Sequence, residues 1–132
     1  MTKVLIVDDN PVDRRFAGAC VEDSGMAISY AENGRDALKV LSEETPDIVL
    51  TDLDMPEMDG LTLVRELRHR TPTLPVILMT AKGSEEIASE ALQAGAASYV
   101  PKRKFKQELM AALNIVNNAS QLECPHFLYH GL

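Results

Sequence analysis

Acidic, hydroxyl and amine side chains follow four of the apolar segments in this 132-residue sequence. Asp8 and Asp9 close the first segment, Asp52 closes the third, Thr80 ends the fourth, and Lys102 follows the fifth. Three carboxylates brought together repel one another unless a cation or raised pKa values compensate them. Oxygen ligands of this kind favour Mg²⁺. A carboxylate beside Mg²⁺, with an amine and a hydroxyl nearby, suits phosphoryl transfer, in which an Asp can become an acyl phosphate.

The segments that must position these groups alternate between strand and helix patterns. Continuous apolar runs predict buried strands at 3–7, 47–51 and 75–80, and weaker strands are expected at 27–31 and 98–100. Apolar residues at helical spacing predict a helix after each strand. This alternation implies parallel strands with right-handed crossovers and helices on both faces. If the first, third, fourth and fifth strands are neighbours, the polar groups share one crevice.

Local signals predict where the helices begin and which faces they bury. Asn10 is the expected N-cap of the first helix, with Pro11 at the first helical position. The chain is expected to turn at Asn33. The predicted inner faces include Phe16, Ala19 and Cys20 in the first helix, and Ile87, Ala91 and Leu92 in the fourth.

Composition indicates one globular domain. The sequence is 45% hydrophobic and 25% charged, with a formal net charge of -7. This charge argues against direct nucleic-acid binding by the domain, because phosphate contacts need clustered Lys and Arg. No apolar stretch is long enough to span a bilayer and no signal peptide is recognisable, so a soluble, cytoplasmic protein without membrane contact is expected.

The sequence resembles the receiver domain of two-component response regulators, of the chemotaxis type. The resemblance covers about residues 3 to 119 and predicts a receiver domain at 1–119, with a C-terminal tail or the start of a linker at 120–132. Five segments carry it: Val7-Asp8-Asp9-Asn10, Ala31-Glu32-Asn33-Gly34, Asp52-Leu53-Asp54-Met55-Pro56-Glu57-Met58-Asp59-Gly60, Met79-Thr80-Ala81 and Ala94-Gly95-Ala96-Ala97-Ser98-Tyr99-Val100-Pro101-Lys102.

The resemblance implies a flavodoxin-like doubly wound parallel sheet of five strands in the order 2-1-3-4-5. It implies that Asp52 accepts a phosphoryl group from a sensor histidine kinase or a phosphotransfer protein. By the same resemblance, Asp9 and Asp52 ligate Mg²⁺ directly, Asp8 acts through water, and the backbone carbonyl of Asp54 supplies a further ligand. Catalysis is then limited to Mg²⁺-dependent self-phosphorylation and self-dephosphorylation.

The resemblance also implies a switch. Lys102 pairs with the acyl phosphate, Thr80 moves toward the phosphoryl group, and Tyr99 changes rotamer to follow it. Phosphorylation adds charge and acceptor oxygens that can bias a bistable surface. A downstream output protein or domain is the implied partner, and a phosphorylation-dependent homodimer is compatible with this scheme.

Two features depart from the family pattern. The family usually has Lys followed by Pro in its fifth loop, whereas here Pro101 precedes Lys102 and Arg103 follows it. Asp54 stands where a neutral polar residue is frequent, and position 82 is Lys. Asp54 and Lys82 lie two residues beyond Asp52 and Thr80 and flank the path of an attacking water. They are therefore predicted to set the lifetime of the phosphoryl group.

Three alternatives stay open from the sequence. A haloacid-dehalogenase-type phosphatase would also use Asp-x-Asp after a strand, although its nucleophile strand comes first and the chain has no room for a cap. A flavin binder would need an anion cradle where Asp8 and Asp9 stand. A pseudo-receiver would bind partners without being phosphorylated.

Overall fold

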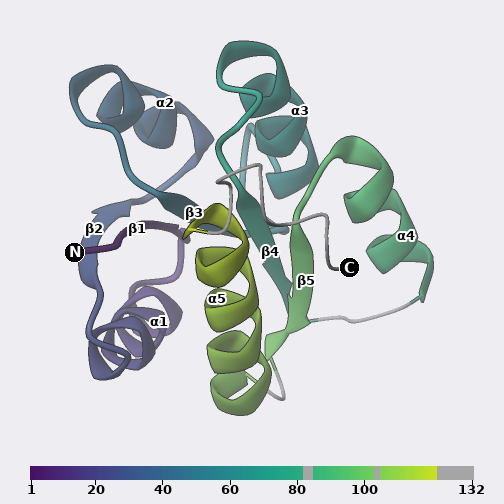
Figure 1. Cartoon of the computed structure of the whole chain (residues 1–132). Coiled ribbons are helices and arrows are strands. Elements are labelled where there is room, and N and C mark those ends of the chain that lie inside the picture. Colours follow the sequence, from purple (N-terminus) through teal and green to yellow (C-terminus); the bar gives the residue numbers. More distant parts are fainter. Residues whose placement is uncertain (82–84, 103–104, 122–132) are drawn as a thin grey trace, which may run out of the picture.

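The computed structural model describes residues 1–81, 85–102 and 105–121. Within these residues, five strands alternate with five helices along the chain (Figure 1). The strands are β1 (Lys3–Val7), β2 (Ala27–Ala31), β3 (Ile48–Asp52), β4 (Val76–Thr80) and β5 (Ser98–Pro101). The helices are α1 (Pro11–Asp23), α2 (Gly34–Glu43), α3 (Gly60–Arg70), α4 (Glu85–Ala94) and α5 (Phe105–Gln121). The domain end expected at residue 119 falls within α5 and stays a prediction.

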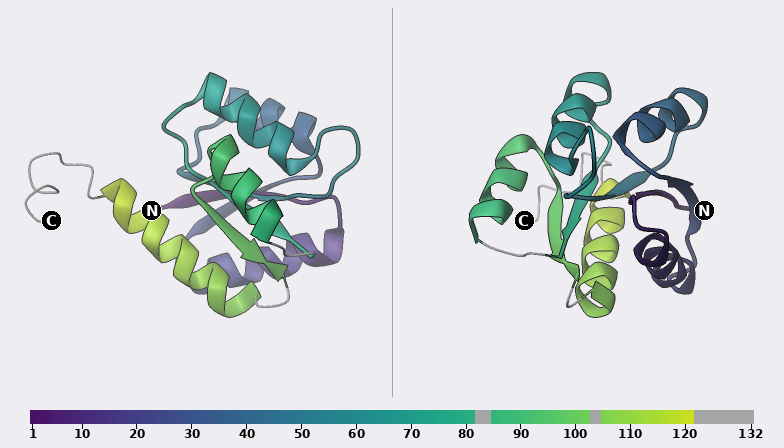
Figure 2. Two further views of the ribbon diagram at one scale, coloured as in Figure 1. Left: turned by 90° about the vertical axis from the view of Figure 1, so that its right-hand side faces the viewer. Right: turned by 180° about the vertical axis from the view of Figure 1, so that it is seen from behind.

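The strands form one sheet in the order β2-β1-β3-β4-β5, and every neighbouring pair is parallel. Helices α1 and α5 cover one face, and α2, α3 and α4 cover the other (Figures 1 and 2). This is the flavodoxin-like doubly wound sheet that the sequence predicted. In such sheets the carboxyl ends of the strands form the edge where ligands bind.

Two hydrophobic clusters, one on each face of the sheet, explain the continuous apolar runs. In β1, Val4 and Ile6 belong to the cluster that contains residues of α1 and α5, whereas Leu5 and Val7 belong to the opposite cluster. A strand covered on both faces has no polar side to present, so it reads as uninterrupted apolar sequence. Within the described ranges, no helix has both the length and the apolar composition needed to cross a membrane.

Side-chain caps begin three of the helices. The Asn10 side chain accepts hydrogen bonds from the backbone N–H groups of Val12 and Asp13, as the predicted N-cap of α1. Asn33, where the sequence predicted a turn, is the N-cap of α2, and Asp59 is the N-cap of α3. Each helix that follows the carboxyl end of β1, β2 or β3 therefore begins at a defined residue.

Two predicted helix faces were partly wrong. Phe16 and Ala19 are exposed, and the buried side of α1 consists instead of Ala17, Gly18, Cys20 and Val21. In α4, Ala91 is buried but Leu92 is 55% exposed. Successive helical residues are about 100° apart. Small side chains allow α1 to lie close to the sheet, and the larger Phe16 then falls at the margin of the buried stripe.

Gly60 fits where the loop after β3 returns to the strand. Its backbone N–H donates to the Leu53 carbonyl over 2.8 Å. A Cβ built at Gly60 would lie 2.9 Å from the Leu53 Cα and would also overlap the Asp52 carbonyl oxygen. Backbone atoms cannot rotate away, so the absence of a side chain at Gly60 allows α3 to start directly beside Asp52.

We expect Gly60→Ala to lower the free energy of unfolding by about 1–3 kcal/mol, the usual cost of overpacking. Gly34→Ala is the matched control, because Gly34 is also the first residue of its helix and the three atoms nearest its added Cβ all belong to the Met58 side chain rather than to backbone. Urea unfolding of both variants checks this. A loss for Gly34→Ala as large as that for Gly60→Ala would contradict the backbone explanation.

Candidate functional site

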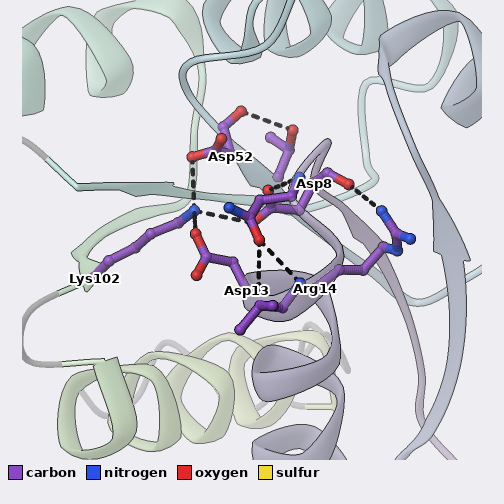
Figure 3. Close-up of polar contacts among 8 residues, drawn as sticks. Asp8, Asp13, Arg14, Asp52 and Lys102 are labelled. Carbon is purple, nitrogen blue, oxygen red and sulfur yellow. Dashed lines mark hydrogen bonds and ion pairs between the residues drawn. The ribbon is translucent and has the colours of Figure 1, made fainter.

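The strand order brings the predicted polar residues to one edge of the sheet. Asp8 and Asp9 follow β1, Asp52 is the last residue of β3, and Thr80 is the last residue of β4. Lys102 follows β5 directly. Because β1, β3, β4 and β5 are consecutive neighbours, these residues come from adjacent strand ends. Figure 3 shows Asp8, Asp52 and Lys102 at this edge of the sheet.

Three carboxylates form the acidic part of the site. One oxygen from each of Asp8, Asp9 and Asp52 lies within 4.8 Å of the other two. Asp8 is fully buried and Asp52 is 5% exposed, whereas Asp9 is exposed. A cluster with oxygen donors only, open to solvent on one side, fits a hard divalent cation that retains waters, as Mg²⁺ does.

The Lys102 ammonium is the cationic part of the site. Its Nζ lies 2.9 Å from Asp8 Oδ2, 2.9 Å from Asp13 Oδ2 and 3.2 Å from Asp52 Oδ1. Pro101, which precedes Lys102 rather than following it, is paired with Thr80 at the end of the edge strand β5. Proline is tolerated on an edge strand, and Lys102 reaches the carboxylates with this order of residues.

The charges in the site shift two pKa values. The pKa of Asp52 is raised to about 6, mainly by burial and also by the charges of Asp8 and Asp9, against the opposing effect of Lys102. Burial alone would lower the pKa of Lys102, but hydrogen bonds to Asp13 and Asp8 and the charges of Asp52 and Asp8 outweigh burial and raise it. The site therefore holds more negative charge than one ammonium neutralises.

Asp8 is held on both of its carboxylate oxygens. The Asn10 backbone N–H donates to Oδ1 over 3.0 Å, and Lys102 donates to Oδ2. The Arg14 guanidinium donates to the Asp8 backbone carbonyl over 2.8 Å. These contacts join the end of β1, the first turn of α1 and the segment after β5.

The remaining predicted residues lie around this centre. Thr80 is fully buried at the end of β4. Tyr99, on β5, is partly buried and packs against the cluster on the face covered by α2, α3 and α4. Asp54 is exposed two residues after Asp52. Lys82 lies outside the described residues.

Asp13 is a site residue that the sequence did not predict. It lies in the first turn of α1, where an acidic residue is expected simply because it complements the helix dipole. Its spacing from Asp8 matches no ligand pattern. Only the position of Lys102, 89 residues away in sequence, reveals its contact.

Comparison with known proteins identifies the class. The sequence matches the response regulator receiver domain family over residues 4–114. This match covers most of the chain, and the chain therefore belongs to the response regulator receiver domain family. It is a phosphoacceptor signalling domain of two-component systems, in a regulatory family rather than a family of catalytic enzymes. This assignment disfavours the phosphatase and flavin-binding alternatives.

Several curated proteins share this domain. Regulatory protein AtoC of Escherichia coli K12 is 42% identical over 123 residues, which are 93% of this chain and 26% of AtoC. DNA-binding transcriptional regulator NtrC of the same strain is 40% identical over 99 residues, 75% of this chain and 21% of NtrC. Virulence transcriptional regulatory protein PhoP of Salmonella typhimurium (strain 14028s / SGSC 2262) is 38% identical over 113 residues, 86% of this chain and 50% of PhoP. The chain thus spans half or less of these relatives.

Solved structures agree with the family and the fold. A response regulator receiver domain protein from Clostridium thermocellum superposes with a TM-score of 0.85 at 29% identity, covering 92% of this chain and 98% of that chain. Chemotaxis protein CheY4 of Vibrio cholerae superposes with a TM-score of 0.81 at 29% identity, covering 88% and 98%.

The raised pKa of Asp52 predicts a pH-dependent stability. We expect Asp52→Asn to raise the free energy of unfolding of the Mg²⁺-free protein by about 1–3 kcal/mol near pH 7.5. The native pKa, about 6, lies above the ordinary value of 3.8, so the native state binds more protons between these values and stability falls as pH rises through them. The increase in the free energy of unfolding caused by Asp52→Asn is therefore absent below pH 3.8 and complete above about pH 6.

Urea unfolding at pH 3.5 and pH 7.5 measures this gain. Asp23→Asn is the control, because Asp23 is an exposed acid at the end of α1. A gain for Asp52→Asn that is equal at both pH values, or equal to that of Asp23→Asn, would contradict the assigned cause.

Proposed function

We propose that Asp52 is the phosphoacceptor of this receiver domain. The observation that carries the proposal is the position of Asp52 at the carboxyl end of β3, 3.2 Å from the Lys102 ammonium and clustered with Asp8 and Asp9. Asp8 is fully buried and already hydrogen-bonded on both oxygens, which makes it a poor nucleophile. Asp52 retains some exposure.

The proposed reaction forms a bond between an Asp52 carboxylate oxygen and phosphorus, while the bond from phosphorus to the donor breaks. The Lys102 ammonium is placed to neutralise charge on a phosphoryl oxygen, which is the main requirement of phosphoryl transfer. In this proposal Asp9 and Asp52 hold Mg²⁺ directly, Asp8 acts through water, and the Asp54 backbone carbonyl completes the protein ligands. When bound, Mg²⁺ adds positive charge against the phosphoryl oxygens.

Thr80 and Tyr99 are the proposed switch residues. Thr80 ends the strand next to β3, one residue beyond Met79, which pairs with Asp52, and its side chain is fully buried. Tyr99 lies on β5, the neighbour of β4, and is only partly buried. In this proposal Thr80 moves toward the phosphoryl group and Tyr99 changes rotamer to follow it, which would alter the surface near β5.

The expected partners follow from the family. A sensor histidine kinase or a phosphotransfer protein is the proposed donor, with self-phosphorylation from small donors and self-dephosphorylation as the remaining chemistry. The transcriptional regulators among the relatives support an output protein or domain downstream. Direct nucleic-acid binding by this domain is not expected at a net charge of -7. A cytoplasmic location and a phosphorylation-dependent homodimer are consistent with this role.

The acceptor is tested by intact mass after incubation with acetyl phosphate, with and without Mg²⁺. We expect the wild-type chain to gain one phosphoryl group only with Mg²⁺, Asp52→Ala to gain none, and the control Asp23→Ala to behave like the wild type. An adduct on Asp52→Ala would overturn the assignment of the acceptor. No adduct on the wild-type chain under any condition would favour a partner-binding pseudo-receiver.

Asp54 and Lys82 are proposed to set the lifetime of the phosphoryl group. Their charged side chains can form hydrogen bonds with a water that attacks phosphorus. We therefore expect the double variant Asp54→Asn, Lys82→Ala to prolong the half-life of the phosphorylated protein about two- to fivefold. This change corresponds to about 1 kcal/mol or less. Loss of the adduct mass with time measures this. The double variant Asp23→Asn, Lys39→Ala removes the same charges from exposed positions elsewhere. Equal half-lives for the wild type and the first double variant would refute the proposal.

A further inference from the structure

The Lys102 ammonium is shared among three carboxylates, and the proposed acceptor is not the nearest of them. Asp8 and Asp13 each lie 2.9 Å from Nζ, whereas Asp52 lies 3.2 Å away (Figure 3). An ammonium has three N–H donors. Two of these donors are used in hydrogen bonds to Asp8 and Asp13, and Asp52 lies at ion-pair distance. Lys102 can therefore move closer to a phosphoryl group on Asp52 only by weakening one of these two hydrogen bonds.

The three partners differ in how readily they can be replaced. The side chains of Asp8 and Asp52 are 0% and 8% exposed, whereas that of Asp13 is 45% exposed. A buried carboxylate that loses its cation has no water to replace it, and this is costly. Asp13 can turn to solvent at little cost, because pairs with an exposed partner contribute little to stability. Asp13 is therefore the partner most easily exchanged.

The backbone around Asp13 is fixed, so its contact with Lys102 follows from the local structure. The Asp13 N–H donates to the Asn10 side chain over 3.1 Å. The next residue, Arg14, is tied to the Asp8 carbonyl through its guanidinium. These bonds hold the first turn of α1 against the end of β1, with the Asp13 carboxylate directed at Lys102 (Figure 3).

We propose that Asp13 is a positioning residue that holds Lys102 in the unphosphorylated protein and competes with the phosphoryl group on Asp52 for its ammonium. This inference rests on the proposed function of Asp52. The Asp13 charge also disfavours approach of an anionic phosphodonor, so both effects act in the same direction. Removal of the Asp13 charge weakens its hydrogen bond with Lys102 and speeds phosphorylation.

The test uses Asp13→Asn, which keeps the shape and removes the charge, and Asp13→Glu, which keeps the charge. Asp23→Asn is the matched control, since it removes one charge from the exposed far end of the same helix. Two quantities are measured at saturating Mg²⁺: the rate of adduct formation with acetyl phosphate, and the dissociation constant for beryllofluoride, a phosphoryl analogue.

We expect Asp13→Asn to increase the rate and tighten beryllofluoride binding by about three- to tenfold, as expected for release of a partly exposed ion pair. Asp13→Glu and Asp23→Asn are expected to stay within about twofold of the wild type, which is the usual range for surface changes. Unchanged or weaker beryllofluoride binding by Asp13→Asn would overturn the competition.

A third measurement does not depend on the phosphoryl group or on metal. The NMR signals of the Lys102 side chain in the Mg²⁺-free protein are expected to shift in Asp13→Asn and not in Asp23→Asn. Absence of that shift would show that Asp13 does not hold Lys102 in solution. If the wild-type chain forms no adduct and binds no beryllofluoride, the proposed function fails. If the wild type does both and Asp13→Asn matches Asp23→Asn, only the inference on Asp13 fails.

Discussion

The site depends on the compensation of several carboxylates by one ammonium. Asp8 and Asp52 are almost fully buried, so neither can rely on water to stabilise its charge. Lys102 contacts both, yet burial, together with the charges of Asp8 and Asp9, still raises the pKa of Asp52 to about 6, so Lys102 does not fully offset the cost of this buried charge. An unbalanced, partly solvent-exposed cluster of oxygens is suited to respond to a divalent cation and then to a phosphoryl group.

The parallel sheet makes this compensation possible. Strands β3 and β4 are buried along their length, β1 is buried after Lys3, and β5 is only partly buried. Each of the four ends in, or just before, a polar residue. Parallel strands present their carboxyl ends at one edge, so four such endings converge without any long-range signal in the sequence. Close approach of the loop after β3 requires Gly60, because any side chain there would overlap the backbone that carries Asp52.

The structure also links the site to α1 more closely than the sequence suggests. Lys102 contacts Asp13 in the first turn of α1, and Arg14 binds the carbonyl of Asp8. A change in the partners of Lys102 therefore affects the start of α1 as well as the end of β5. Receiver domains act as switches. In this chain the Lys102 ammonium, which follows β5, connects that strand to the first turn of α1 beside the proposed phosphorylation site.

The sequence by itself determined the element order, because apolar runs bounded by Asn10, Pro11 and similar breakers are local signals with local causes. It also supplied Asp52 and Lys102 as candidates, since their types and their places after strands are visible along the chain. The tertiary structure alone decided which helix residues are buried, as Phe16 shows, and which acids share the ammonium, as Asp13 shows. The physical reason is the same in both cases. Burial and charge pairing depend on distances between segments far apart in sequence, and only the packed sheet fixes those distances.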